Sequence, residues 1–597
     1  MVALALGAFL AGAIAGAVHS NGSTAPALAA RFAAAWARGD YAAMYTEITP
    51  SSRRAVSAGQ FAAAYREASM LATATSLRVS GRPRAAAGGV EVVPVVVRTR
   101  LFGTLRSSLR LPVVSVPGAA GPRVAWASSL AFPGLRPGER LHRVTSLPPR
   151  AALLARDGSV LATGPATEAG QRSSPLGAAA SAVVGGVGPI PAARRVALEA
   201  EGLPANAIVG VSGLELYFDE RLRGTPGGQL LAGERVLASA APRAGTDVRT
   251  SVSPAVQQAA VEALGGQYGG VVALEPASGQ ILGVAGIGLE GLQPPGSTFK
   301  MVTVTGVLQA HVASPSSTFA YATSATLDGV QLHNSESESC GGTLTEAFAV
   351  SCNSVFAPLG VKLGAKRLVA TAERYGFNQP SGIAGVPQST IPPAAEIQGE
   401  LAVGSTAIGQ DQVLATPLEM DIVAATIADG GRRPTPTFGL AGNGAGAQGE
   451  AGAQGEAGTQ SDGRGVGVTS AAIARSVRAM MIEVVRSGTG TSAAIPGVVV
   501  AGKTGTAELG GSGTSCPAAG AEADAAETAT NPSTHEPEAA GCGAKEKSSP
   551  QSTDAWFASF APAAQPKIAV AVLLVRDGFG GATAAPVARQ VLEAGLR

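Results

Sequence analysis

Lysine is scarce in this 597-residue chain, which has 7 lysines against 37 arginines and none before Lys300. The arginines form no basic tract and do not alternate with aromatic residues, so we expect no nucleic-acid or other polyanion partner. The five histidines are scattered and the four cysteines lack metal-ligand spacing, so we expect no structural metal. Because the chain has no GxSxG motif and no suitably placed histidine, a chymotrypsin-like or α/β-hydrolase triad is poorly supported.

Charge is absent from the first stretch, "MVALALGAFLAGAIAGAV". At about 1.5 Å per residue, a helix of this length covers most of a bilayer's hydrocarbon core. The pattern predicts a membrane anchor over residues 1–20, with the remainder of the chain on the extracellular side. A cleaved signal peptide and a buried helix rich in alanine and glycine are the alternatives.

Four cysteines allow three pairings, and an extracellular location would permit their oxidation. Their spacing favours two disulfides, one between Cys340 and Cys352 and the other between Cys516 and Cys542.

The length predicts about three domains after the anchor. Residues 24–135 read as helices followed by strands, an α+β module in which Phe32, Trp36, Tyr41 and Tyr45 belong to a core. Residues 140–250 are rich in proline, glycine and alanine, with a hairpin around Asp157 and Gly158. Residues 251–597 form the largest domain, which opens on the hairpin "GGVVALEPASGQILGVAG". Its low-complexity stretches, 441–466 and 510–552, are expected to be mobile surface loops without catalytic residues.

The stretch "PPGSTFKMVTV" places Ser297 at the predicted start of a helix, where backbone N–H groups favour developing negative charge. Lys300 follows three residues later on the same helical face, so its amine could reach the serine hydroxyl. A base in this position has to be lysine, because a guanidinium keeps its proton whereas burial can lower an amine pKa by several units. Ser297 is the only serine three residues before a lysine. Without further motifs, a helix cap beside a solvated lysine would explain the same pattern.

Two further clusters support the catalytic interpretation. In "AVSCNSVF", Ser351 and Asn353 lie two apart, and their hydroxyl and amide could relay a proton and bond both a lysine and a substrate amide. In "GVVVAGKTGTAELGG", a β-branched strand leads into four residues that could pair with an extended peptide and bind its terminal carboxylate: Lys503, Thr504, Gly505 and Thr506.

The motifs SxxK, SxN and KTG, in this order, form the set found in penicillin-recognising serine enzymes. With "VALEPASGQILGVAG" and "DAWFASFAP", they make the chain resemble a class B penicillin-binding protein, a peptidoglycan D,D-transpeptidase. The stretch "GVSGLELYFDERLRGTPG" resembles that family's dimerisation or pedestal region, and "FAAAWARGDYAAMY" resembles a cone-shaped nuclear-transport-factor-like extension. The implied fold is multidomain α+β: an anchor (1–20), a cone-like domain (24–135), a pedestal (140–250) and a transpeptidase domain with an antiparallel sheet flanked by helices (251–597).

The resemblance also implies roles for these residues. Ser297 would be the nucleophile that attacks peptidoglycan stem peptides and β-lactams, and Lys300 would be its base. Ser351 and Asn353 would relay the proton and position Lys300, while the backbone N–H groups of Ser297 and Thr506 would form the oxyanion hole. Lys503 and Thr504 would hold the substrate carboxylate, and Gly505 and Thr506 would also belong to the substrate-binding strand. A membrane glycan polymerase is the implied partner, and no cofactor or metal is implied.

Four other functions remain open at this stage. A D,D-carboxypeptidase or β-lactamase would share the motifs but let water resolve the acyl-enzyme; the anchor and the noncatalytic modules favour a transpeptidase instead. A catalytically silent scaffold is opposed by the intact motifs, and a β-lactam receptor by the lack of an intracellular signalling segment.

Overall fold

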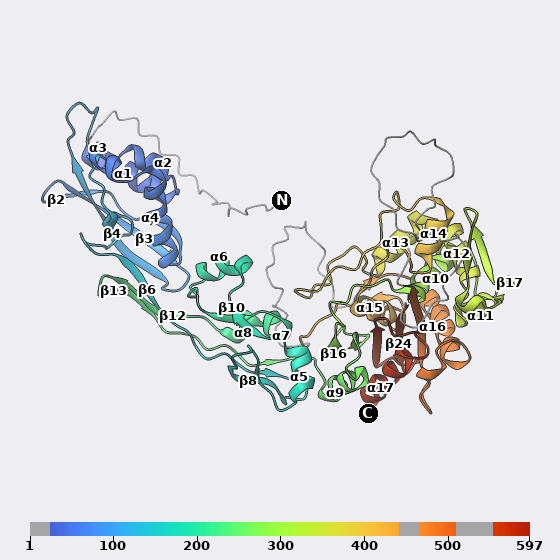
Figure 1. The fold of residues 1–597 in the computed structure, drawn as a ribbon. Coiled ribbons are helices and arrows are strands. Elements are labelled where there is room, and N and C mark those ends of the chain that lie inside the picture. Colours follow the sequence, from blue (N-terminus) through green and yellow to red (C-terminus); the bar gives the residue numbers. More distant parts are fainter. Residues whose placement is uncertain (1–23, 441–464, 509–552) are drawn as a thin grey trace, which may run out of the picture. The chain divides into compact units, whose positions relative to one another are not determined.

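The computed structural model describes residues 24–440, 465–508 and 553–597, and these form two compact units (Figure 1). Unit 1 contains the chain up to Pro149 together with Pro189–Ala207 and Gly224–Ala244. Unit 2 contains Arg150–Gly188, Ile208–Arg223 and Gly245–Arg597. The predicted pedestal range is thus shared between the units, and the domain limits drawn from the sequence stay predictions.

Unit 1 begins with four helices: α1 (Ala25–Ala37), α2 (Tyr41–Thr46), α3 (Pro50–Ala55) and α4 (Ala58–Leu71). They precede a five-stranded antiparallel sheet, in which β3 lies between β4 on one side and both β1 and β2 on the other. Its strands are β1 (Ala74–Val79), β2 (Arg84–Ala86), β3 (Val90–Thr99), β4 (Thr104–Val114) and β5 (Arg123–Val124).

The helices of unit 1 cover one face of this sheet. Burial alternates along β3, where Val93, Val95 and Val97 face the core and the residues between them do not. Phe32 and Trp36, one helical turn apart in α1, are buried in the same core, so the core assignment of these two aromatic residues is confirmed. Tyr41 and Tyr45 are half-buried at its margin.

A second sheet in unit 1 joins β13 (Arg235–Ala240), β12 (Gly227–Ala232) and β6 (Leu141–Ser146). The remaining elements of this unit are η1 (Ser128–Leu130) and α6 (Ala192–Ala200).

The central sheet of unit 2 is antiparallel, in the order β16 (Ile281–Gly286), β15 (Gly269–Leu274), β25 (Ile568–Leu574), β24 (Thr553–Ala561) and β23 (Ala501–Glu508). Every residue of β15, β24 and β25 is buried, because helices cover both faces. One face packs against α9 (Pro254–Leu264) and α17 (Ala584–Leu596); the other packs against α15 (Pro417–Ala428). The predicted antiparallel sheet flanked by helices is confirmed, as is the hairpin of β15 and β16.

Outside its pedestal segments, unit 2 has these further helices: η2 (Gly296–Phe299), α10 (Lys300–Gln309), η3 (Ser335–Ser337), α11 (Leu344–Ala349), α12 (Asn353–Leu363), α13 (Ala365–Tyr375), α14 (Gly399–Ala407), α16 (Ala471–Arg486) and η4 (Thr491–Ala493). Small sheets pair β17 (Thr318–Ala322) with β20 (Cys340–Thr343), β18 (Ser324–Leu327) with β19 (Val330–His333), and β21 (Arg432–Arg433) with β22 (Val466–Gly467).

The pedestal segments of unit 2 comprise α5 (Gly177–Val184), α7 (Gly213–Tyr217), α8 (Asp219–Arg223), a pair of β10 (Val187–Pro189) with β11 (Ile208–Gly210), and a sheet of β14 (Val248–Arg249), β7 (Leu153–Leu154), β8 (Val160–Ala166) and β9 (Arg172–Ser173). The strands β7 and β8 are antiparallel, which confirms the hairpin predicted around Asp157 and Gly158.

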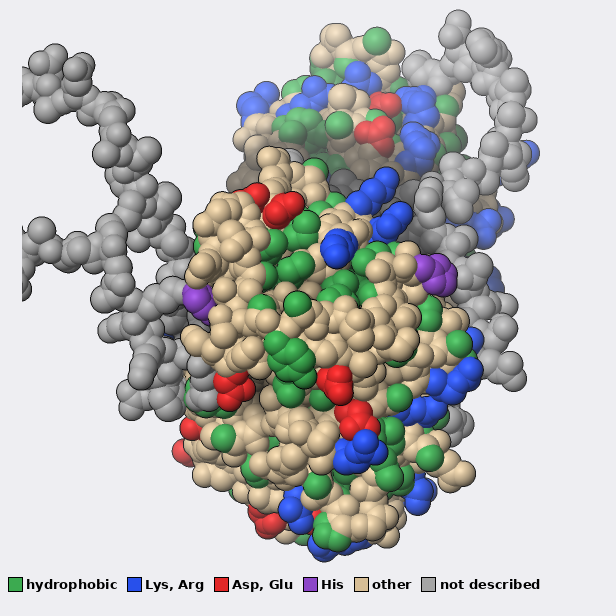
Figure 2. Space-filling model, turned by 90° about the vertical axis from the view of Figure 1, so that its right-hand side faces the viewer, with side chains coloured by type: hydrophobic (Ala, Val, Ile, Leu, Met, Phe, Trp, Pro, Cys, Tyr) green, Lys and Arg blue, Asp and Glu red, His purple; other side chains and the backbone are tan. Residues whose placement is uncertain are grey.

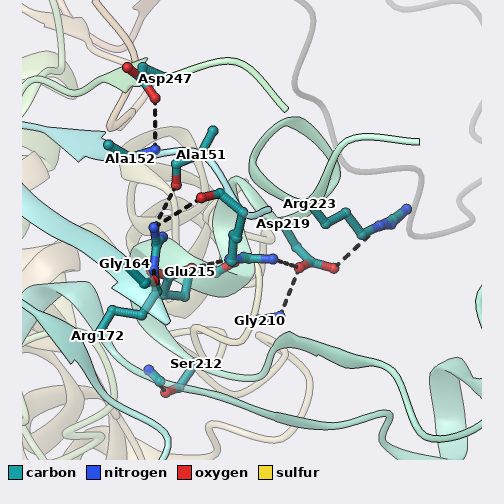
Figure 3. A network of polar contacts seen from close by, with 12 residues as sticks. Ala151, Ala152, Gly164, Arg172, Gly210, Ser212, Glu215, Asp219, Arg223 and Asp247 are labelled. Carbon is teal, nitrogen blue, oxygen red and sulfur yellow. Dashed lines mark hydrogen bonds and ion pairs between the residues drawn. The ribbon is translucent and has the colours of Figure 1, made fainter. Parts of the chain in front are cut away.

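A buried charge network ties these segments together (Figure 3). Arg150 donates to Glu215 at 2.6 Å and to Asp219 at 2.8 Å, and Arg172 donates to Glu215 at 2.9 Å. Asp219 also accepts the backbone N–H of Gly210 at 2.7 Å. Since each buried charge here has an opposite partner, removing one member would strand the others, which is the costly way to disrupt such a network.

The predicted anchor, residues 1–20, lies outside the described residues. Within the described ranges, which start at residue 24, no helix is long and apolar enough to cross a bilayer. The low-complexity stretches also lie outside the described part of the chain, except that Gly465 and Val466, the last residues of the first stretch, lead into β22.

Helix α15 contains an unusual buried acid. The side chain of Asp421 is fully buried, and neither of its carboxylate oxygens has a hydrogen-bond partner among the residues that the structure describes. Burial raises the pKa of Asp421 well above its ordinary value, because the low-dielectric core disfavours the charged form. Folding therefore favours the neutral form of Asp421.

We expect Asp421→Asn to raise the melting temperature at pH 8 and to have little effect near pH 4. Above a pKa of about 3.9, the unfolded chain releases this proton while the folded chain retains it. The native aspartate therefore loses up to about 1.4 kcal/mol of stability per pH unit as the pH rises toward its folded pKa. Asparagine cannot ionise and removes that loss.

Melting curves of both proteins between pH 4 and pH 8 would measure the effect, with Asp411→Asn as the control because Asp411 is exposed. A difference between wild type and Asp421→Asn that does not grow with pH would contradict a buried neutral acid.

Candidate active site

Ser297 lies in a short turn beside the edge of the central sheet. It is the second residue of the 3₁₀ turn η2, and the α-helix itself begins only at Lys300, so the prediction that Ser297 starts the helix is corrected by one turn. Gly296 adopts a φ of +51°, and a Cβ there would lie 2.6 Å from the carbonyl oxygen of Thr506. Only glycine allows η2 to approach β23 this closely.

Lys300 points away from solvent into a polar cage. Its side chain is fully buried, and Nζ donates to the carbonyl oxygen of Ser351 at 2.7 Å and to Oδ1 of Asn353 at 2.6 Å. The hydroxyl of Ser351 lies 3.3 Å from the same nitrogen. Among the described residues, no hydrogen bond joins Lys300 to the hydroxyl of Ser297, so the proton transfer between them stays a prediction.

The SxN motif occupies a break between two helices. Helix α11 ends at Ala349 and α12 begins at Asn353, which leaves Ser351 in the connection with a φ of +61°. Such a conformation is unfavourable for a residue with a Cβ, so the surrounding structure must hold it. Asn353 is held in turn, because its Nδ2 donates to the carbonyl oxygen of His333 at 3.0 Å.

A disulfide between Cys340 and Cys352 braces this break. It links β20 to the residue between Ser351 and Asn353, and it is the pairing that the sequence spacing favoured. The second predicted pair, Cys516 and Cys542, lies outside the described residues.

Lys503 approaches the same serine from the sheet. It is buried in β23, and its Nζ donates to Oγ of Ser351 at 2.9 Å and to the carbonyl oxygen of Thr504 at 3.0 Å. The structure thus brings the three motifs together, with the hydroxyl of Ser351 between the two lysine amines.

Both amines are electrostatically destabilised as cations. Burial, and secondarily the positive charge of Lys503, lower the pKa of Lys300 well below its ordinary value. Burial lowers the pKa of Lys503 to about 7. Neither amine forms an ion pair with a carboxylate in the described ranges, and the nearest aromatic rings, Phe356 and Phe348, lie 5.6 Å and 5.5 Å from Lys300 and Lys503. Burial therefore favours the neutral form of both amines, and a neutral amine can accept a proton.

The outer edge of β23 can receive an extended peptide. Among the described strands, β23 is the last of its sheet. The carbonyl oxygen of Thr506 points away from β24 and accepts a hydrogen bond from Nε2 of Gln410 at 3.3 Å. In an antiparallel strand, the N–H and C=O of one residue face the same side, so the N–H of Thr506 also faces this edge. The close approach of Gly296 places Ser297 next to it, as an oxyanion hole requires.

Two contacts in the site were not predicted from the sequence. Thr489 shares a 2.6 Å hydrogen bond with Thr504, and Gln410 bonds to Thr506. Threonine and glutamine are common on surfaces, and neither residue belongs to a motif that assigns it a role. Their positions could be known only from the folded chain.

Comparisons with known proteins agree with this arrangement. A family model described as the penicillin-binding protein transpeptidase domain matches residues 269–533, and one described as the penicillin-binding protein dimerisation domain matches residues 164–236. The chain is 32% identical over 412 residues to the peptidoglycan D,D-transpeptidase PbpA of Mycobacterium tuberculosis, covering 60% of this chain and 73% of the relative. It is 31% identical to PbpA of Mycolicibacterium smegmatis, covering 65% and 80%.

Solved structures show the same likeness. The penicillin G acyl-enzyme complex of penicillin-binding protein A from M. tuberculosis matches with 26% identity and a TM-score of 0.53, covering 75% of this chain and all of that one, 100%. A D,D-transpeptidase domain from Eggerthella lenta matches with 26% identity and a TM-score of 0.53, covering 76% and 99%.

We expect Gly505→Ala to lower the melting temperature by separating η2 from β23. A Cβ at Gly505 would lie 2.7 Å from the carbonyl oxygen of Pro295 and 2.9 Å from Cβ of Trp556, so backbone must move. Overpacking of this kind costs about 1–3 kcal/mol. Gly467→Ala is the matched control, since Gly467 is also in a strand and its new Cβ would meet nothing within 4 Å. Equal melting temperatures for the two variants would contradict tight packing at Gly505.

Proposed function

This chain belongs to the class B penicillin-binding proteins, the peptidoglycan D,D-transpeptidases, and we propose that Ser297 is the nucleophile of its reaction. The enzyme cross-links stem peptides of peptidoglycan during cell-wall synthesis through a serine acyl-enzyme, and it binds penicillin covalently. One observation carries the assignment of the site: a fully buried Lys300, unpaired with any carboxylate in the described chain, three residues after Ser297.

In the acylation step, Oγ of Ser297 attacks the carbonyl carbon of the penultimate D-Ala, and the hydroxyl proton passes to the neutral amine of Lys300. The N–H groups of Ser297 and Thr506 stabilise the negative charge that develops on the carbonyl oxygen. When the tetrahedral intermediate collapses, the peptide C–N bond breaks and the terminal D-Ala leaves after its nitrogen gains a proton.

Ser351 supplies the path for that proton. Its hydroxyl lies 3.3 Å from the amine of Lys300 and 2.9 Å from that of Lys503. A hydroxyl can accept and donate at once, so it can pass the proton from Lys300 to the leaving nitrogen. Asn353, which accepts from Lys300 at 2.6 Å, keeps the amine in place and offers its amide to the substrate.

The substrate lies along the outer edge of β23. Lys503 and Thr504 bind the terminal carboxylate, while Gly505 leaves room for the extended backbone. The acceptor amine of a neighbouring stem peptide then attacks the acyl-enzyme carbonyl. It loses a proton to Lys300 and forms the new C–N bond of the cross-link. The ester bond to Oγ of Ser297 breaks, and the proton returns from Lys300 to that oxygen.

We further propose that residues 1–20 anchor the enzyme in the cell membrane with unit 2 outside, where peptidoglycan lies. The apolar, uncharged composition of that stretch supports the proposal. A membrane glycan polymerase is the proposed partner, because stem peptides must be cross-linked as new strands are made.

The nucleophile can be identified by intact-mass spectrometry after benzylpenicillin is added to the protein. We expect the wild type to gain the mass of the whole drug and keep it for many minutes, since ring opening of a β-lactam releases no leaving group and deacylation is slow. Ser297→Ala should gain nothing, because the attacking oxygen is gone.

Ser405→Ala is the control, since Ser405 is a half-buried serine of unit 2 outside the site. It should be acylated like the wild type. An adduct on Ser297→Ala would refute the assignment of the nucleophile, and a wild-type adduct that forms and disappears would indicate a β-lactamase instead.

Reduction of the disulfide should slow acylation by benzylpenicillin. The bond between Cys340 and Cys352 holds the break that contains Ser351, whose φ of +61° needs support. Without the disulfide, the hydroxyl of Ser351 and the amide of Asn353 should occupy a wider range of positions. We therefore expect acylation to be severalfold slower, while the protein stays folded at the assay temperature.

In a variant with Cys516→Ser and Cys542→Ser, Cys340 and Cys352 are the only cysteines left, so a reductant can act on that disulfide alone. Stopped-flow acylation of this variant with and without reductant would measure the effect, and Cys340→Ser should reproduce it. Equal rates under both conditions would show that the disulfide does not position the motif.

A further inference from the structure

Positive charge is concentrated in the first part of the chain. Residues 24–149 contain sixteen arginines, no lysine and five acidic residues, a net charge of +11, whereas the whole chain carries +2. Figure 2 shows that the visible face of unit 2 mixes basic and acidic side chains, without a large patch of either sign. Unit 1 therefore carries the excess charge.

The register of the sheet in unit 1 gathers five of these arginines on one face. Val96 of β3 is paired with Arg78 of β1 on one side and Arg106 of β4 on the other. Four residues away along β3, Val92 is paired in the same way with Arg84 of β2 and Arg110 of β4. Directly opposed residues in a sheet project to the same face, so these four arginines flank a central row of valines.

Arg98 extends the same face, because it is separated from Val96 by two residues along β3 and side chains repeat every second residue. We call this surface the basic face, formed by Arg78, Arg84, Arg98, Arg106 and Arg110. All five side chains are exposed, and in the described ranges none forms an ion pair with a carboxylate. The acidic residue of β3, Glu91, is buried on the opposite face, toward the helices.

The basic face is flat and wide enough to meet several anionic groups at once. Arg106 and Arg110 are four residues apart on one strand, about 14 Å, and the arginines on either side of β3 are two strand spacings apart, about 10 Å. Between them lie Val92, Pro94 and Val96, all half-buried. Helices α1–α4 pack against the other face of the sheet (Figure 1), so in the described chain no helix covers this one.

We propose that the basic face binds the anionic headgroup surface of a phospholipid membrane. A guanidinium donates paired hydrogen bonds to phosphate, and a cluster of arginines is attracted to an anionic bilayer by its surface potential. The half-exposed valines and proline add an apolar centre that suits the interface between headgroups and acyl chains. Unit 1 also follows directly in sequence on the uncharged apolar stretch of residues 1–20, which is expected to lie in the bilayer.

This surface was missed in the sequence because its arginines come from four different strands. They occur singly among apolar residues over residues 78–110, and no window contains a basic tract. The pairing of β1, β2 and β4 around β3 brings them together. The expectation that the chain has no polyanion partner therefore rested on local sequence alone.

Vesicle co-sedimentation tests the proposal. The protein would lack residues 1–23, which keeps every described residue but removes the apolar stretch, and its fold would be checked by circular dichroism and acylation by benzylpenicillin. We expect binding to vesicles with equal parts of phosphatidylglycerol and phosphatidylcholine, and none to phosphatidylcholine alone. Binding should disappear at 1 M salt, where the Debye length is about 3 Å.

Two variants with the same net charge distinguish the contribution of the basic face to vesicle binding from that of overall charge. Replacing its five arginines by glutamine should weaken vesicle binding at least a hundredfold, since each arginine near an anionic surface contributes about fivefold. The control replaces five exposed arginines on other elements of unit 1, and it should bind within a few fold of wild type. Its substitutions are Arg38→Gln, Arg54→Gln, Arg136→Gln, Arg140→Gln and Arg195→Gln.

Three results would overturn the proposal. Equal loss of binding in both variants would show that net charge matters and the basic face does not. Binding of soluble poly(glycerol phosphate), but not of vesicles, would identify a phosphate polymer as the partner. No binding to either would leave the arginines as residues that merely keep the edges of the sheet soluble.

Discussion

The burial of two lysine amines around one serine hydroxyl is the constraint on which the catalytic unit depends. Lys300 and Lys503 are both removed from solvent without a compensating carboxylate in the described chain, and their nearest polar partners are neutral. Burying a cation in this way is unfavourable, so the amines lose affinity for their protons. The surrounding core must therefore be stable enough to hold groups that it disfavours.

The elements around the site are arranged to meet that demand. The central sheet has both faces covered and supplies Lys503 from its edge strand, while η2 packs against the same strand through two glycine contacts, Gly296 and Gly505. The break between α11 and α12 supplies Ser351 in a conformation that a disulfide helps to maintain. Backbone strain and buried charge are thus concentrated at the site of the reaction, and the packed core around the site supplies the stability that holds them.

Local patterns predicted much of this arrangement. The hairpin of β15 and β16 and the helix after Ser297 follow from short-range periodicity and turn residues. The strand at Lys503 was misplaced, because β23 begins at Ala501, after the β-branched run that predicted it. The pairing of Lys300 with Ser297 stays a prediction, because the spacing of residues in a helix does not say which of several nearby oxygens an amine will bond, and here those oxygens belong to Ser351 and Asn353. The contacts of Gln410 and Thr489 were also beyond prediction, since they depend on which loops the fold brings to the edge of β23.

The sequence by itself determined the chemistry of the protein: a serine followed by a lysine, the SxN pair and the KTG strand are local motifs whose residue types permit few reactions. Only the tertiary structure decided how these motifs cooperate, because their partners lie about 50 to 200 residues apart in the chain and meet through sheet pairing and helix packing. The basic face of unit 1 is the same case. Each arginine is unremarkable in its own strand, and only the register across four strands turns separate charges into one surface.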